Sequence, residues 1–241
     1  MARSHLLALA VMTAGVAALA LVPLVADGDA RPSPQGKDAA ASRFEARLLE
    51  IARTYETYGR VDNEYRWAPQ LCRAPSPGAA RFSASGDAKT HGRKLYSLFA
   101  DDQTAYLELP KVQPVGQVIV KQSWVPEAIP DGAKLPEVVI RRVPAPPAKE
   151  GAKFRPVFGP DAFLPYSYKD GKYYKAARQA DLFIMYKLEA TTEGSDQGWV
   201  YGTVTADGKK VTSAGRVEAC MKCHQKAAHD RLFGLAGKGG R

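Results

Sequence analysis

The chain has 241 residues and carries 34 Lys and Arg against 25 Asp and Glu, which gives a net charge of +9. Hydrophobic residues make up 45% of it, enough to bury a core, and the length suits a single globular domain. Because the basic residues are scattered and form no run, the charge favours an acidic protein partner and argues against nucleic acid.

The first 26 residues have the pattern of a secretory signal peptide. Arg3 precedes an uncharged apolar stretch over residues 6–26, and cleavage after Ala20 or after Ala26 suits the small residues there. An uncleaved membrane anchor is the alternative, because about 20 apolar residues can span a bilayer. In both cases the folded part is exported, so the predicted location is periplasmic. Cleavage would remove Arg3 and lower the net charge from +9 to +8.

The N-terminal part of the mature chain is predicted to be a linker followed by a helix. Residues 27–42 are polar and rich in Ala and Pro, which favours a linker. Over residues 43–58 apolar side chains recur at helical spacing, so a helix with one buried face is expected, and residues 43–241 are expected to form one domain. The dense Pro, Ser and Gly of residues 67–92 predict irregular structure, in which Cys72 is expected to be buried as a small hydrophobic residue.

Runs of β-branched and aromatic residues predict an antiparallel sheet in the middle of the chain. The predicted strands cover residues 94–100, 104–109, 116–125, 137–143, 181–188 and 199–205. A hairpin is expected at the Asp207-Gly208 turn, because Asp-Gly suits a tight connection between antiparallel strands. A helix over residues 218–232 is expected to follow.

The segment Cys220-Met221-Lys222-Cys223-His224 has the spacing through which c-type haem is attached. On a helix, positions i, i+3 and i+4 share one face, so two thiols can reach the haem vinyl groups while an imidazole binds the iron. We therefore predict one covalent haem c, held by Cys220 and Cys223, with His224 as the proximal iron ligand.

Two other interpretations of this motif are a zinc half-site and a redox dithiol. Zinc would need two further ligands, and the candidates Cys72, His91 and His229 form no second clustered pair. A dithiol usually occurs within a βαβ unit, which the pattern does not predict. His91 could alternatively approach a haem iron or lie in a turn, and Met185 could be a thioether ligand or pack in the core.

The predicted fold class is α+β: an antiparallel β-sheet domain with an N-terminal helix and a C-terminal haem-bearing helix. Two common cytochrome classes do not fit. Small electron carriers have the haem motif near the N-terminus and a methionine ligand downstream, whereas no methionine follows His224 here. Four-helix cytochromes need long amphipathic helices, which the Val-, Tyr-, Thr- and Pro-rich centre cannot provide.

A β-sheet followed by a C-terminal CxxCH helix resembles the cytochrome P-460 family and its relatives, the β-sheet cytochromes c-prime. The resemblance covers residues 90–233 and rests on the strand Gly116-Gln-Val-Ile-Val-Lys121, the aromatic segment Gly198-Trp-Val-Tyr201 and the haem motif. It implies that Lys121 matches a strand lysine bonded covalently to the haem edge, as a third attachment. On the strand pattern alone, Lys121 is a surface lysine.

The resemblance also implies a role for Glu218, which matches the position of a proton-accepting carboxylate in hydroxylamine-oxidising relatives. The alternative is a helix role, since an acidic residue in a first turn interacts favourably with the helix dipole.

Three functions remain open. The first is an oxidoreductase that converts hydroxylamine, or a related small nitrogen species, and passes electrons to an acidic partner cytochrome. The second is a protein that binds nitric oxide or a similar gas, and the third is an electron carrier with six-coordinate iron. We favour the first, and a homodimer is left open.

Overall fold

The computed structural model describes residues 34–65, 72–87, 90–141 and 161–234. The predicted signal segment, residues 1–26, lies outside this part of the chain. No helix within the described ranges is long and apolar enough to cross a membrane.

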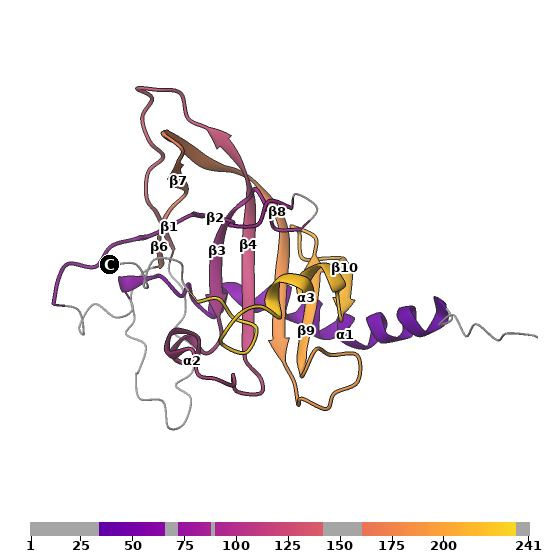
Figure 1. The fold of residues 1–241 in the computed structure, drawn as a ribbon. Helices are drawn as coiled ribbons and strands as arrows, with labels where there is room; N and C mark the ends of the chain where they lie inside the picture. The colour runs from indigo at the N-terminus through magenta and orange to yellow at the C-terminus, as the bar shows by residue number, and fades with distance from the viewer. Residues whose placement is uncertain (1–33, 66–71, 88–89, 142–160, 235–241) are drawn as a thin grey trace, which may run out of the picture. The chain divides into compact units, whose positions relative to one another are not determined.

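Seven strands of the described part form one sheet in which every neighbouring pair is antiparallel (Figure 1). Its order is β10-β9-β8-β4-β3-β2, and β7 pairs with β8 beside this path. The strands are β2 (Arg81–Phe82), β3 (Leu95–Ala100), β4 (Val118–Ala128), β7 (Tyr166–Lys169), β8 (Lys172–Lys187), β9 (Trp199–Val204) and β10 (Val211–Gly215). A smaller sheet joins β1 (Gly78–Ala79), β6 (Asp161–Leu164) and β5 (Val139–Arg141), with β1 parallel to β6.

The predicted antiparallel sheet is confirmed, and the hairpin of β9 and β10 turns at the predicted Asp-Gly pair. The strand predicted over residues 104–109 is wrong, because that segment is the helix α2 (Gln103–Glu108). The side chain of Asp102 caps this helix by accepting a hydrogen bond from the backbone N–H of Ala105, 3.0 Å away. This local contact overrides the strand preference of the aromatic and β-branched residues there.

The N-terminal helix is longer than predicted. It begins at Pro34, so residues 34–42 of the predicted linker are helical and only residues 27–33 lie before the helix. The run Lys37-Asp-Ala-Ala-Ala contains good helix formers and no helix breaker, which explains the extension.

α1 (Pro34–Thr54) covers one face of the sheet. Its residues Phe44, Leu48 and Ile51 are buried against Val118 and Val120 of β4 in one apolar cluster. Because successive side chains of a strand point to opposite faces, Ile119 and Lys121 of β4 point to the other face.

That other face is covered by the C-terminal helix α3 (Glu218–His224), and Figure 1 shows α1 and α3 on opposite sides of the sheet. Cys220 and Met221 of α3 pack against a second apolar cluster that contains Ile119, Met185 and Tyr201. α3 ends at His224, eight residues before the predicted end, and the chain turns back farther on through Asp230 and Arg231, both with positive φ.

Candidate functional site

α3 presents the two cysteines and the histidine of the motif within two helical turns. The side chain of Cys220 is partly buried against the apolar cluster, whereas Cys223 is exposed, and both are free thiols. Burial raises the pKa of the Cys220 thiol to about 11, so it stays protonated at neutral pH. The pair is therefore placed at the edge of an apolar surface, with one thiol turned inward and one outward.

The imidazole of His224 is oriented by the chain that follows the helix. Its Nδ1–H donates a hydrogen bond to the backbone carbonyl of Arg231, 2.7 Å away. The Arg231 guanidinium in turn donates two hydrogen bonds to the carboxylate of Asp196, at 2.9 and 3.1 Å, and Tyr201 donates a third at 3.1 Å. Burial lowers the pKa of His224, so the ring is neutral and keeps the lone pair of Nε2 available.

Lys121 lies on the sheet face that α3 covers, with Leu98 and Phe183 as its neighbours on β3 and β8. Its ammonium nitrogen stands 4.2 Å from the ring centre of Tyr96 and 3.4 Å from Nδ1 of His91. The side chain keeps some solvent access, yet protein atoms surround it on most sides, and this burial lowers its pKa to about 8. About a tenth of Lys121 is therefore a neutral amine at pH 7, far more than for an ordinary lysine.

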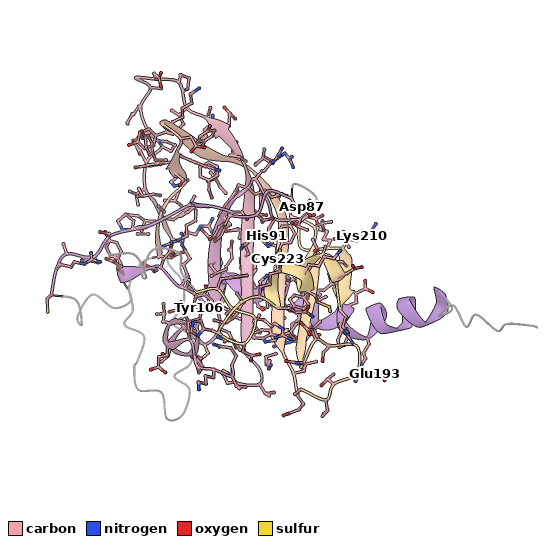
Figure 2. All side chains as sticks on the ribbon, in the orientation of Figure 1. Asp87, His91, Tyr106, Glu193, Lys210 and Cys223 are labelled. Carbon is pink, nitrogen blue, oxygen red and sulfur yellow. The ribbon has the colours of Figure 1, made fainter. Side chains whose placement is uncertain are left out.

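His91 reaches the same place from the loop between β2 and β3. Its Nδ1 lies 3.0 Å from the hydroxyl of Ser83, and its ring centre is 6.5 Å from that of His224. Figure 2 shows the side chain of His91 in the same region as Cys223 of α3. Burial, and next the positive charge of Lys121, lower the pKa of His91 to about 3, so this imidazole is neutral as well.

Of the predicted site residues, the structure brings Lys121 and His224 to one place and turns Glu218 outward. The Glu218 side chain is 80% exposed and forms an ion pair with Lys222, 2.9 Å away, in the first turn of α3. Met185 is buried in the apolar cluster on the α3 side of the sheet. Cys72 is exposed, so its predicted burial is wrong.

Sequence reasoning named His91 only as an alternative and missed Ser83, Asp196 and Arg231. The tripeptide Thr90-His-Gly92 carries no signal for a position beside α3. The hydrogen bond between His91 and Ser83 joins residues 8 positions apart, and the one between Arg231 and Asp196 joins residues 35 positions apart. No local sequence pattern predicts either contact.

Within the described ranges, no group of three or more His, Cys, Asp or Glu side chains is placed to hold a metal ion. Haem needs no such group, because the porphyrin supplies four of the iron ligands and the protein one or two. The residues present fit haem c, since α3 offers two free thiols and a neutral imidazole whose other nitrogen is already hydrogen-bonded. The neighbouring face of the sheet offers apolar side chains for a macrocycle.

A comparison of the chain with models of known protein families finds no match, and a comparison with curated proteins finds none either.

Proposed function

We propose that this chain is an exported mono-haem c-type cytochrome of P-460 type. Cys220 and Cys223 hold the haem, His224 is its proximal ligand, and Lys121 forms a further covalent link to its edge. The protein oxidises hydroxylamine or a related small nitrogen species and passes the electrons to an acidic partner cytochrome. Export rests on the signal pattern of residues 1–26, and the partner's charge rests on the net charge of +9.

The observation that carries this proposal is the position of Lys121. It projects from the same sheet face against which Cys220 packs, and its lowered pKa increases the fraction of neutral amine, the form that can bond to carbon. The bond would replace one hydrogen on Nζ and one on the haem edge, and an external two-electron oxidant such as a peroxide would have to accept them. A lysine of purely structural function would gain more by turning its charge to water.

A bound haem would supply the redox chemistry, accepting electrons from the substrate one at a time. Side chains and backbone groups of the protein would orient this haem and shield it from water. The carbonyl of Arg231 holds Nδ1 of His224, which leaves Nε2 for iron, and the apolar cluster around Ile119 and Met185 excludes water. Neutral His91 adds no positive charge beside a cationic iron centre, and the lowered pKa of Lys121 reduces the charge that this side chain carries there.

The test is made on protein produced with a cytochrome c maturation system. The intact mass is expected to exceed that of the polypeptide by one haem, and proteolysis is expected to yield a haem peptide joining the segments of Lys121 and Cys220. Lys121→Met is expected to keep the haem and to change the absorption spectrum to that of ordinary haem c. The control Lys172→Met, at an exposed position of β8, is expected to keep the wild-type spectrum.

A bare polypeptide mass would refute the haem proposal. Identical spectra of wild type and Lys121→Met would refute the cross-link.

The outward position of Glu218 favours a second candidate, a protein that binds nitric oxide without turnover. Oxidation of hydroxylamine releases protons as well as electrons, so an acceptor near the substrate lowers the barrier. In the structure this carboxylate pairs with Lys222 at the surface. Steady-state oxidation of hydroxylamine with an artificial electron acceptor separates the two candidates, because a gas-binding protein shows no turnover and tight nitric oxide binding.

A further inference from the structure

His91 and His224 face one site from opposite parts of the fold. His224 belongs to α3, whereas His91 belongs to the loop before β3, and their ring centres are 6.5 Å apart with the planes inclined by 72°. Two imidazoles that bind one metal ion from opposite sides have ring centres about 6 Å apart, since each metal–nitrogen bond is about 2 Å long and the ring centre lies about 1 Å farther. The observed separation therefore suits a shared iron.

Both rings also have the same nitrogen engaged. Nδ1 of His224 donates to the Arg231 carbonyl, and Nδ1 of His91 lies 3.0 Å from Ser83 Oγ. Nζ of Lys121 also lies 3.4 Å from Nδ1 of His91. When Lys121 is a neutral amine, Nδ1–H of His91 can donate to the Ser83 hydroxyl, and Nε2 then carries the lone pair and is the nitrogen able to bind a metal. Histidine ligands usually have their other ring nitrogen held by such a hydrogen bond, which sets the tautomer and the ring orientation.

The loop that carries His91 is fastened at its base. The backbone N–H of Ser83 donates to the carbonyl of Lys94, and that of Arg93 donates to the carbonyl of Ser85. Gly92, next to His91, is packed so closely that an added Cβ would lie 2.1 Å from the carbonyl oxygen of Asp87. Backbone contacts on both sides of His91 thus hold it in place, and moving it away would require breaking them.

We propose that His91 is the distal ligand of the haem iron, bound through Nε2, and that a small molecule must displace it to reach the metal. This inference rests on the haem of the proposed function and not on its reaction or on the Lys121 link. It makes His91 a gate: the resting iron is six-coordinate, and access to it depends on how often the imidazole dissociates.

The test is the spin state of the ferric protein, read by electron paramagnetic resonance on samples whose haem content has first been measured by mass. The wild type is expected to be low-spin. His91→Ala is expected to become high-spin, and added imidazole is expected to restore the low-spin signal by filling the vacated position. His229→Ala, which alters the other histidine of the C-terminal region, is expected to stay low-spin.

Nitric oxide binding to the ferrous protein gives a second readout. His91→Ala is expected to bind nitric oxide at least about tenfold faster than wild type. In the wild type the His91 imidazole occupies the iron for most of the time, and in the variant this competing ligand is gone. Ser83→Ala keeps the histidine and removes only its hydrogen bond, so a partial effect in the same direction is expected even if His91→Ala folds poorly.

The outcomes separate the two proposals. A high-spin wild type, or a His91→Ala protein that keeps the wild-type low-spin signal, overturns the distal ligand while leaving the haem and its cross-link intact. Haem without a Lys121 peptide contradicts the P-460 assignment and leaves the distal ligand standing. A protein that takes up no haem overturns both.

Discussion

The carbonyl oxygen of Arg231 accepts a hydrogen bond from Nδ1 of His224 at 2.7 Å, because the chain turns back after α3 through Asp230 and Arg231. Arg231 is held in turn by Asp196, from the loop before β9. The position of the predicted haem ligand therefore depends on an ion pair that anchors the segment after α3 to the sheet.

The first prediction concerns this ion pair. The Arg231 hydrogen bond holds the pKa of Asp196 below its ordinary value, so the carboxylate binds protons less readily in the folded than in the unfolded chain. Its contribution to stability is complete above the unfolded pKa of about 4 and is lost as the pH falls through the lower folded value. Asp196→Asn should lower the free energy of unfolding at neutral pH, and its difference from wild type should shrink at acidic pH.

Urea unfolding of both proteins from pH 7 down to pH 3 measures this difference. The control is Glu189→Gln, an exposed carboxylate on the same loop, for which a small change is expected. A difference between wild type and Asp196→Asn that grows as the pH falls would contradict the prediction.

The second prediction concerns the thioether links. Cys220→Ala and Cys223→Ala should each lose one link to haem, and the double variant should carry no covalent haem, because the motif offers only these two thiols. Cys72→Ala, which changes the exposed cysteine outside the site, should retain the full haem mass. Intact mass spectrometry after denaturation measures the covalently bound haem, and retention of haem in the double variant would show that the motif is not the attachment site.

The third prediction concerns Glu218. Since this side chain is exposed and paired with Lys222, Glu218→Gln should cost less than about 1 kcal/mol of stability and leave turnover within a few-fold of wild type. Lys222→Gln removes the same ion pair while keeping the carboxylate, so it should have a similar effect. A loss of about 10² to 10⁴ in rate confined to Glu218→Gln would instead identify the residue as the general base.

The fourth prediction concerns the opposite face of the sheet. A Cβ at Gly202 of β9 would lie 2.4 Å from Cδ2 and 2.6 Å from Cδ1 of Leu48, which is fully buried in α1. Gly202→Ala should therefore destabilise the fold by about 1–3 kcal/mol through overpacking. Gly86→Ala, where an added Cβ meets no atom within 4 Å, is the matched control. Thermal unfolding measures both, and equal melting temperatures would show that α1 can shift without cost.

Local patterns in the sequence were sufficient to predict several features. The alternation and β-branched content of β3, β4, β8 and β9 predicted strands, and the apolar spacing over residues 43–58 predicted α1, because these signals depend on neighbours a few positions apart. The candidate ligands Cys220, Cys223 and His224 came from spacing within five residues. The same reasoning failed over residues 104–109, where one capping contact from Asp102 favours a helix.

Only the tertiary structure decided what stands around the motif. Lys121 and His91 are 30 residues apart and become neighbours because β3 pairs with β4 and carries its preceding loop over the same face. Burial of Lys121 and of His91, and the outward position of Glu218, likewise follow from which side of the sheet α3 covers. The physical reason is that side-chain periodicity is a property of the local backbone, whereas desolvation and long-range contacts exist only once the sheet and its two covering helices have packed.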